Sequence, residues 1–425
     1  MAEILILGGG MSGISAAGHA GLAGREAMIF EAEDRWGGLL DNFTVKGFRF
    51  DQAVHFAFSN NKHFQKVLDG INCHVHYPEP YNYESGRWLK HPVQNNLFPL
   101  PAEERVEAVL SFINRPAQDD GADYRGWLEQ QFGKVIAERY PARYTEKYWT
   151  VPPEKMSTDW IGNRLYRPSL EEVLFGAMTD RTPATYYLPK MYYPKKGGFR
   201  TVLEKLARGL DIRTNKEAVH IEPQKKYVDF ADGSREYYNL LVSSVPLPEL
   251  VRLIAGTPRA VLEAAAGLWA TSIALVSLGF CSPQAGEHLW FYIYDREILP
   301  ARAHAPYRKS PDNVPPGCSS LQFETYFSRY KPLPLEGEAL VEHILATVEK
   351  LGLAEKKDVA ASDYRVLPYG NVVFDRGMVE RRDFVLKHIR DCGILSVGRF
   401  GEWDYLWSDQ CFLSGRRVLE HLSVL

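Results

Sequence analysis

The apolar pattern at the start of the chain predicts a strand, a tight turn, a helix and a second strand. Residues 4–7 form a short apolar run, and residues 27–30 form another. Small side chains recur between the two runs at helical spacing, at Ser15, Ala16, Ala17 and Ala20. Because the periodicity changes from that of a strand to that of a helix and back, the N-terminus predicts the opening of an α/β fold.

Further strands are predicted much later in the chain. Residues 219–221 and 227–230 read as a hairpin, whereas 240–245 and 394–397 are short apolar runs typical of buried strands. A last helix is expected at about 412–422. These pieces suit one sheet whose strands are separated by long insertions.

A glycine-rich turn joins the first strand to the first helix. Gly8, Gly10 and Gly13 stand in the G-x-G-x-x-G register. The first glycine permits the turn, the second lets backbone amides approach a pyrophosphate, and the third allows close packing of helix and strand. Glu31 ends the second strand 18 residues after Gly13, where a carboxylate can accept hydrogen bonds from a ribose diol. The context predicts a bound dinucleotide.

A second glycine pair specifies the dinucleotide. Arg35 is followed by Gly37 and Gly38, an Arg-x-Gly-Gly pattern for which a nicotinamide enzyme has no use. In flavoproteins resembling the amine oxidases, such a pair lets the chain pass close to the FAD pyrophosphate and flavin. We therefore expect bound FAD. The cofactor-binding residues expected in this region are Gly8, Gly10, Met11, Ser12, Gly13, Glu31, Arg35, Gly37, Gly38 and Leu39.

Two insertions interrupt the dinucleotide fold. Residues 101–180 are helical in pattern and rich in Tyr and Trp, and 265–380 alternate like strands. The sequence predicts an α/β protein with a discontinuous Rossmann-like FAD-binding domain, an inserted helical domain and an inserted antiparallel sheet domain. The expected boundaries are 1–72, 195–260 and 385–425 for FAD, 101–194 for the helices with a mobile lid, and 73–100 with 261–384 for a substrate-binding sheet.

Composition limits the classes of function. A chain of 425 residues suits two or three domains, and a net charge of −3 argues against general affinity for nucleic acid or membranes. Local arginines must therefore hold any anionic ligand. The five cysteines are odd in number and form no C-x-x-C, which argues against a disulfide framework or a metal site and suits a reducing cytoplasm. No apolar run reaches membrane-spanning length.

Five segments resemble, in the same order, motifs of the UDP-galactopyranose mutases. They are His55 (G-x-H-x-F), 92–96 (P-F-Q-N-N), 144–149 (Y-T-E-K-x-W), 302–311 (F-Y-R-A-T-I-F-S-N-Y-S-P) and 398–405 (G-R-x-G-x-Y/W-x-Y). Since the order is kept from end to end, the resemblance covers most of the chain.

Three positions depart from the family pattern. Phe58 replaces a second histidine, Asn371 stands where a tyrosine is expected, and Asp409 occupies an acidic or asparagine position. In the family these positions belong to the sugar and pyrophosphate pocket, so they bear on the substrate more than on the fold.

The resemblance implies a mutase that interconverts the pyranose and furanose forms of a nucleotide sugar, with a UDP-sugar as the expected substrate. N5 of reduced FAD would attack the anomeric carbon and displace the nucleoside diphosphate, with no net redox change. Arginine suits the diphosphate because its planar fork grips phosphate oxygens. The expected catalytic residues are Arg167, Arg302 and His55, with Arg164 as the alternative to Arg167.

The same resemblance assigns the remaining site residues. The expected substrate-binding residues are Gln94, Tyr144, Trp149, Arg164, Tyr369, Asn371 and Tyr405. Further cofactor contacts are expected from His55, Val219, Gly398, Arg399, Tyr405, Asp409 and Gln410. A lid is expected at 175–189, where it would close over the substrate and exclude water.

A net oxidoreductase of the amine oxidase or protoporphyrinogen oxidase type remains the alternative, because it shares the FAD fold. Amine oxidases often carry a lysine near flavin N5, and Lys195 and Lys196 keep that option open. No second dinucleotide fingerprint is present, so NADPH or NADH would bind only transiently as reductant. A homo-oligomer is left open.

Overall fold

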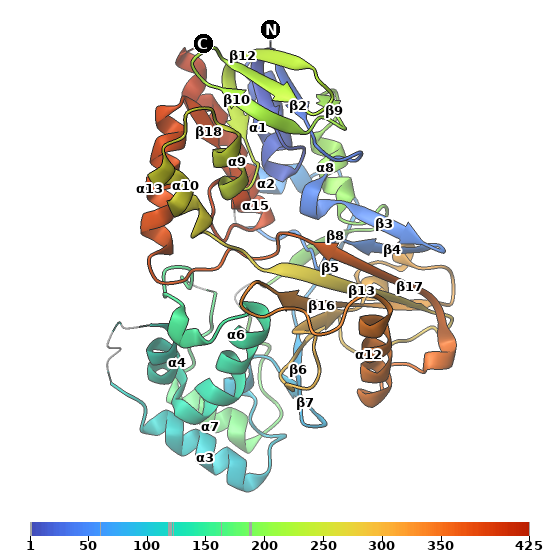
Figure 1. Ribbon diagram of the computed structural model, residues 1–425. Coiled ribbons are helices and arrows are strands. Elements are labelled where there is room, and N and C mark those ends of the chain that lie inside the picture. Colours follow the sequence, from blue (N-terminus) through green and yellow to red (C-terminus); the bar gives the residue numbers. More distant parts are fainter. Residues whose placement is uncertain are drawn as a thin grey trace.

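The computed structural model describes residues 2–59, 61–117, 121, 123–162, 164–186 and 189–424, and it is built around two seven-stranded sheets. Figure 1 shows the first sheet at the top with both chain termini, the second sheet across the middle, and a group of helices at the lower left. No described helix is long and apolar enough to cross a membrane.

The first sheet is assembled from three distant stretches of chain. β1 (Ala2–Leu7) lies between β2 (Ala27–Phe30) and β12 (Arg235–Ser243) and is parallel to both. β9 (Asp211–Arg213) pairs with β2, and β18 (Ile394–Ser396) pairs with β12, again in parallel. These strands read as apolar runs because helices cover both faces of a parallel sheet.

A predicted hairpin completes the first sheet. β10 (Ala218–Glu222) and β11 (Tyr227–Phe230) pair antiparallel, and β11 continues antiparallel to β12. The sequence placed this hairpin at 219–221 and 227–230, so that prediction is confirmed.

The glycine turn has the geometry that its sequence predicts. Gly8 has φ of 100°, and α1 (Met11–Leu22) begins directly after Gly10. A Cβ on Gly13 would lie 2.0 Å from the Gly8 carbonyl oxygen, so any side chain there would separate helix and turn. The backbone N–H of Gly37 donates to the Gly9 carbonyl at 2.9 Å, which brings the second glycine pair over the first turn.

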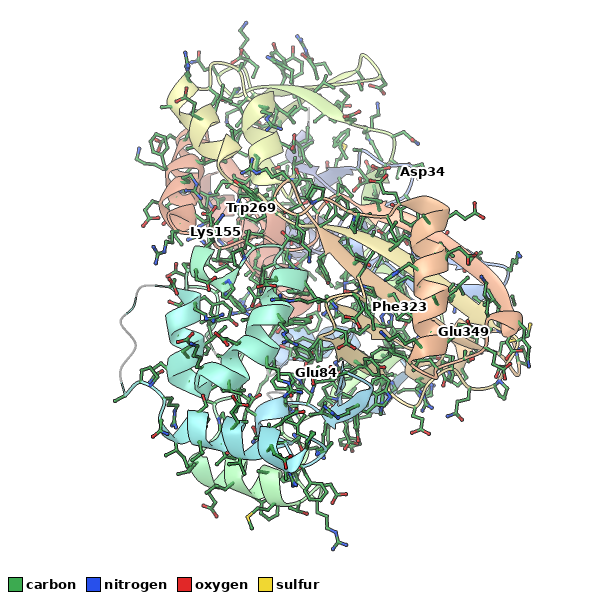
Figure 2. The ribbon with its side chains drawn as sticks, turned by 60° about the horizontal axis from the view of Figure 1, so that its bottom comes forward. Asp34, Glu84, Lys155, Trp269, Phe323 and Glu349 are labelled. Carbon is green, nitrogen blue, oxygen red and sulfur yellow. The ribbon has the colours of Figure 1, made fainter. Side chains whose placement is uncertain are left out.

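The second sheet is largely antiparallel and has an apolar interior. Phe323, labelled in Figure 2, is fully buried on one of its central strands, and α12 (Gly337–Lys350) packs against the sheet. In spatial order its strands are β17 (Val359–Leu367), β13 (Ser272–Phe280), β16 (Ser319–Phe327), β15 (Arg302–His304), β14 (Trp290–Ile293), β6 (Tyr81–Glu84) and β7 (Arg87–Lys90).

The inserted helices are joined to this sheet by buried polar contacts. Arg139 donates to both oxygens of Glu84 at 2.7 and 2.8 Å, and Glu84 lies at the end of β6 (Figure 2). Lys147 donates to three backbone carbonyls, one at the end of β14 and two beyond it. The helices are α3 (Ala102–Ile113), α4 (Tyr124–Phe132), α5 (Lys134–Ala137), a π-helical turn (Glu138–Ala142), α6 (Arg143–Tyr148) and α7 (Leu170–Met178).

Two small sheets and several helices connect the larger parts. The small sheets are β3 (Asn42–Val45) with β4 (Phe48–Asp51), and β5 (Cys73–His76) with β8 (Met191–Pro194). The remaining helices are α2 (Lys62–Leu68), α8 (Arg200–Leu206), α9 (Leu247–Leu253), α10 (Arg259–Ala266), α11 (Pro306–Lys309), α13 (Met378–Asp391), α14 (Gly398–Gly401) and α15 (Ser408–Gly415).

The α/β class with a discontinuous first sheet, inserted helices and an inserted antiparallel sheet is confirmed. Two details differ from the sequence-based expectations. β5 and β8 pair with each other although they were assigned to different domains. The expected helix at 412–422 is divided between α15 and a 3₁₀ segment, Arg416–Val424; a Cβ on Gly415 would lie 2.4 Å from the Ser12 carbonyl oxygen of α1. The domain boundaries stay a prediction.

Candidate active site

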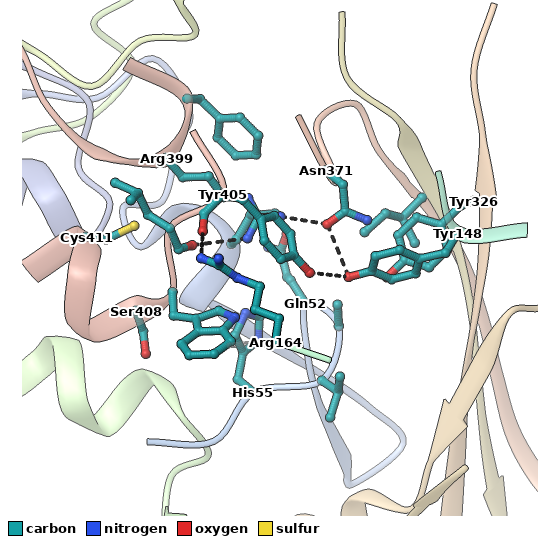
Figure 3. A pocket seen from close by; sticks show the side chains of 18 of the residues that line it. Gln52, His55, Tyr148, Arg164, Tyr326, Asn371, Arg399, Tyr405, Ser408 and Cys411 are labelled. Atoms are coloured by element: carbon teal, nitrogen blue, oxygen red, sulfur yellow. Dashed lines mark hydrogen bonds between the residues drawn. The ribbon is translucent and has the colours of Figure 1, made fainter. Parts of the chain in front are cut away.

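A cavity of about 680 Å³ extends from the glycine turn to the inserted helices. Figure 3 shows part of its lining, with side chains from the second sheet (Tyr326), from helices (Tyr148 and Cys411) and from loops directed toward the same space. The structure brings these predicted residues to its wall: Gly8, Gly10, Met11, Ser12, Glu31, Gly37, Gly38, Leu39, His55, Gln94, Tyr144, Trp149, Arg164, Arg302, Asn371, Gly398, Arg399 and Tyr405.

Two predicted substrate-site residues do not reach the cavity. Arg167 is exposed and lies over the ring of Trp127, 5.2 Å from its centroid. Tyr369 instead donates its hydroxyl to Glu249 at 2.8 Å. Arg164, the alternative to Arg167, does line the cavity. The family register therefore indicated an arginine in this segment, and the structure brings Arg164 rather than Arg167 to the cavity.

Several predicted cofactor residues support the wall without lining it. Gly13 is buried where α1 meets the turn, and Val219 is 47% exposed although its neighbour Ala218 lines the cavity. Asp409 and Gln410 lie in the first turn of α15, where the Gln410 side chain accepts a hydrogen bond from the backbone of Trp407.

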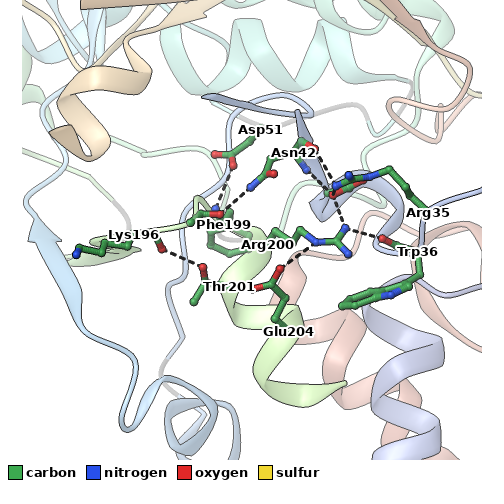
Figure 4. A network of polar contacts seen from close by, with 11 residues as sticks. Arg35, Trp36, Asn42, Asp51, Lys196, Phe199, Arg200, Thr201 and Glu204 are labelled. Carbon is green, nitrogen blue, oxygen red and sulfur yellow. Dashed lines mark hydrogen bonds and ion pairs between the residues drawn. The ribbon is translucent and has the colours of Figure 1, made fainter. Parts of the chain in front are cut away.

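Arg35 does not line the cavity but stabilises the turn that carries the second glycine pair, Gly37 and Gly38. Its guanidinium donates to both oxygens of Asp41 at 2.9 Å. Arg200, which was not predicted, reaches the same carboxylate, donates to the Trp36 carbonyl at 2.7 Å and lies over the Trp36 ring (Figure 4). The two arginines thus fix the turn that carries Gly37.

At the end of the cavity formed by the glycine turn, a ligand has room to contact the backbone directly. The position of a Cβ on Gly10 has no protein atom within 4 Å. Glu31 accepts the Gly9 N–H at 2.7 Å and also faces the cavity. Among the described residues of the wall, Glu31 is the only acid and Lys216 the only lysine; the backbone of Lys216 donates to the Glu31 carbonyl at 2.8 Å. The residues present fit an FAD pyrophosphate and ribose.

Tyr405 lies between two arginines of the cavity wall, Arg164 and Arg399 (Figure 3). The guanidinium carbon of Arg164 is 5.0 Å from the Tyr405 ring centroid, and that of Arg399 is 4.5 Å away. Arg164 also donates to the carbonyls of Trp160 and Tyr405 at 2.7 and 2.8 Å. Neither arginine has an acidic partner among the described residues, so both charges remain available to an anion.

Asn371 connects this group to α6. Its Oδ1 accepts from Arg399 at 2.6 Å and from the Tyr148 hydroxyl at 3.3 Å. Because arginine only donates, the amide oxygen must face Arg399 and the amide nitrogen must point elsewhere. The hydroxyls of Tyr148 and Tyr405 are 3.0 Å apart, and Tyr144 stacks on Tyr148.

Arg302 is held by a buried carboxylate. Glu324 accepts from Arg302 Nε and from the Tyr326 hydroxyl, each at 2.5 Å, and from the backbone N–H of Val54 at 2.9 Å. Burial alone would lower the pKa of Arg302, but the Glu324 carboxylate outweighs it and keeps the pKa above its usual value. Arg302 is thus a fixed cation, linked through Glu324 to the loop that carries His55.

His55 is a neutral imidazole at physiological pH. Burial lowers its pKa to about 4, although the Asp51 carboxylate opposes this effect. The ring stacks on Phe199, and Nδ1 has no hydrogen-bond partner. Phe58, which replaces the family's second histidine, packs edge-on against Trp407.

Several buried polar atoms of wall residues have no hydrogen-bond partner among the described residues. Apart from His55 Nδ1 and the Tyr140 hydroxyl, they are Nε1 of Trp160, Nε of Arg164, Nδ2 of Asn371 and Nε of Arg399. All four are N–H donors.

Sequence reasoning missed several residues that complete this wall. Tyr148 lies within the quoted Y-T-E-K-x-W motif and four residues after Tyr144, so helical spacing could have identified it. Tyr326 and Glu324 sit two residues apart on β16, on the same face of the strand. No sequence signal singled out Trp160.

Comparison with known proteins agrees with this geometry. The family model described as flavin containing amine oxidoreductase matches residues 11–384. Among sequence relatives, a 4,4'-diapolycopene oxygenase from Methylomonas is 21% identical over 421 residues, covering 85% of this chain and 84% of the relative.

Solved structures resemble the chain over its whole length. The crystal structure of a reduced UDP-galactopyranose mutase is similar with a TM-score of 0.93 and 25% identity, covering 100% of this chain and 96% of that one. A protein from Exiguobacterium described as a protoporphyrinogen oxidase is similar with a TM-score of 0.76 and 18% identity, covering 100% and 99%. The resemblance to the mutases drawn from the sequence motifs is therefore confirmed at the level of the complete fold.

Proposed function

The chain belongs to the flavin containing amine oxidoreductase family, and we propose that within it the protein is a mutase that interconverts the pyranose and furanose forms of a nucleotide sugar. The observation that carries the proposal is the presence of Arg164 and Arg302 on the same cavity wall, with no acidic partner of Arg164 among the described residues. Such a pair of arginines suits the diphosphate of a nucleotide sugar. Similarity to a UDP-galactopyranose mutase, with a TM-score of 0.93, supports the same assignment.

FAD would be held by the glycine turn, Glu31, Gly38 and Arg399, whose neighbour Gly398 lies against Ser12 at the start of α1. When bound and reduced, FAD would supply the nucleophile for the anomeric carbon, so the reaction needs no net oxidation. NADPH or NADH would serve as the reductant and would reach the flavin through the open cavity. We expect the protein in the cytoplasm, where such reductants are available.

The arginines would stabilise the departing diphosphate. Charge develops on its oxygens as the bond to the sugar breaks, and cations already held in place stabilise that charge without reorganisation. Glu324 holds Arg302, and backbone carbonyls hold Arg164. Burial raises the pKa of Tyr405, so its hydroxyl stays protonated and can donate to the same oxygens.

The polar groups around the sugar would orient it. Neutral His55 can exchange hydrogen bonds with a sugar hydroxyl without adding a charge next to the flavin. Asn371 offers a free amide N–H where the family has a tyrosine hydroxyl. Gln94 donates one N–H to the Tyr166 carbonyl at 3.1 Å, so its second N–H and its amide oxygen are left for a ligand. A UDP-sugar is the proposed substrate class.

The oxidoreductase alternative lacks its expected lysine. Lys195 and Lys196 are exposed and do not line the cavity. Among the described residues of the wall, the only lysine, Lys216, lies beside Glu31 at the ribose end. This arrangement favours the mutase over amine oxidation.

A substrate panel tests the proposal. Dithionite-reduced protein is incubated without oxygen with UDP-, GDP- and dTDP-sugars, and ring isomers are separated by chromatography. We expect isomerisation of a UDP-sugar by the reduced protein and none by the oxidised protein, with substrate and product of equal mass. Turnover of the oxidised protein with peroxide formation would instead assign it to the oxidases.

A further inference from the structure

Two cysteines face each other at the end of the second sheet that is remote from the cavity. β13 and β16 run antiparallel, and their register ends with Phe280 opposite Ser319. The next residue on each path is a cysteine, Cys281 after β13 and Cys318 before β16. Residues 281 and 318 are distant in sequence but become cross-strand neighbours in the fold.

The backbone orientation brings the two residues close. The N–H of Cys281 donates to the carbonyl of Asp358 at 2.7 Å, on the side of β17. The backbone groups of Cys281 therefore point away from β16, which makes Cys281 and Cys318 a non-hydrogen-bonded pair. Such pairs have Cα atoms about 4.5 Å apart, within the range of about 4.4–6.8 Å that a disulfide spans.

The side chains already interact. Burial raises the pKa of the Cys318 thiol, and the adjacent Cys281 side chain raises it further. Cys318 packs against the small apolar cluster of Phe48, Phe50 and Ala361, whereas Cys281 is exposed. One thiol is thus accessible to a small reagent, and the other is fixed beside it.

We propose that Cys281 and Cys318 form a redox-active dithiol that closes reversibly to a cross-strand disulfide by exchange with a low-molecular-weight disulfide such as glutathione disulfide. The Cys281 thiolate attacks the reagent, forms a mixed disulfide and releases one glutathione. The Cys318 thiolate then attacks the Cys281 sulfur and releases the second glutathione. Each cysteine loses one proton, each glutathione thiolate gains one, and the two electrons pass to glutathione.

The bond would close the segment 282–317 into a loop that carries cavity residues. β14 and β15, with Tyr292 and Arg302, both lie in this segment. The cavity end of β13 is at Ile273, about eight residues and roughly 25 Å from Cys281 at the usual rise per residue. Closure would therefore limit unfolding of the segment without touching the substrate, and oxidation would act on stability.

The test uses the FAD-bound full-length protein with glutathione disulfide. After exchange, free thiols are alkylated and the peptides are mapped by mass spectrometry. We expect a Cys281–Cys318 linked peptide, with Cys73, Cys392 and Cys411 alkylated. The midpoint of thermal unfolding should rise by several degrees and return with dithiothreitol, because loop closure reduces the entropy of the unfolded chain.

Matched variants make the result specific. C318S should leave glutathione attached to Cys281 and should show no rise in the unfolding midpoint, whereas C73S should behave as the wild type. If the wild-type protein retains two free thiols at Cys281 and Cys318, or keeps glutathione on Cys281 as C318S does, the geometry does not permit the bond and the proposal is refuted.

Discussion

At the scale of single residues, the sequence-based expectation and the structure differ most clearly over which of two nearby arginines reaches the cavity. Arg164 faces the cavity and Arg167 faces solvent. We predict that Arg164→Ala weakens binding of a nucleoside diphosphate by about 1.5–3 kcal/mol, the usual loss of a charge-assisted contact. Arg167→Ala, which removes the same charge three residues away, should change affinity little. Calorimetric titration of both variants, each with full flavin content, measures the two affinities for the nucleoside diphosphate. Equal losses of affinity would contradict the placement of Arg164 in the cavity and Arg167 outside it.

Buried histidines give the protein an acid-sensitive stability. Burial lowers the pKa of both His55 and His91 to about 4, against about 6.5 in an unfolded chain. Between those values the unfolded chain binds protons that the folded chain does not, so stability should fall as pH drops from 6.5 to 4 and stay level above 6.5. Each histidine should cost roughly 2–3 kcal/mol by pH 4.

Urea unfolding at pH 5 and pH 7 measures this dependence. His91→Gln keeps a polar side chain that cannot titrate, so its stability should fall less between the two pH values than that of the wild type. An identical fall in variant and wild type would show that His91 does not contribute.

The sequence placed residues correctly on the cavity wall where a local motif fixes their position. Gly8, Gly10 and Glu31 were identified because a turn and a strand end dictate them. Which of Arg164 and Arg167 reaches the cavity depends on tertiary folding, which local pattern does not specify.

At the scale of elements, one irregular helix explains a second omission. The π-helical turn Glu138–Ala142 contains Pro141 and directly precedes α6. It shifts the phase of α6 relative to the helix before it, and so sets which face of α6, here the one shared by the stacked Tyr144 and Tyr148, meets the cavity. Regular periodicity cannot reveal such a shift, since it is set by tertiary packing.

The structure places only part of the expected lid, 175–189, in a loop. Residues 175–178 belong to α7, and 187–188 lie outside the described residues. Lys90 of β7 contacts the loop between them, because its ammonium group donates to the Thr182 carbonyl at 3.0 Å. Thr185 of the same loop lines the cavity.

We therefore predict that a bound nucleotide sugar protects this loop. Trypsin should cleave reduced protein after Arg181 without ligand and at least several-fold more slowly with it, because closure over the substrate would reduce access to the loop. Cleavage after the exposed Lys357, far along the chain, should not change and serves as the control. Equal rates at Arg181 with and without ligand would leave the lid unsupported.

At the scale of the whole molecule, cofactor binding should be separable from folding. A Cβ on Gly10 meets no protein atom, whereas a Cβ on Gly13 would collide with the Gly8 carbonyl. We predict that Gly10→Ala yields a folded protein that has lost most of its yellow FAD, because the methyl group would occupy the space for the pyrophosphate. Gly13→Ala should instead lower the unfolding temperature of the protein itself. Absorbance at 450 nm and circular dichroism measure the two effects; a yellow Gly10→Ala protein would contradict this reading of the turn.

The overall architecture was predictable from the sequence. Apolar runs with a period of two or 3.6 marked both sheets and the inserted helices, and ordered motifs related them to a known fold. The pairing of β5 with β8 was not predictable, because their partners are distant in sequence and neither strand carries a motif.

The order of strands in the first sheet also governs how the protein is made. β1 leaves the ribosome early, but its partner β12 begins at residue 235 and β18 at residue 394. At about 5–20 residues per second, the apolar edge of β1 waits roughly 10–50 s for β12 to be synthesised. Arg399, on the wall beside the glycine turn, follows later still. The nascent chain is therefore a natural client for chaperones, and its flavin can be loaded only after translation is almost complete.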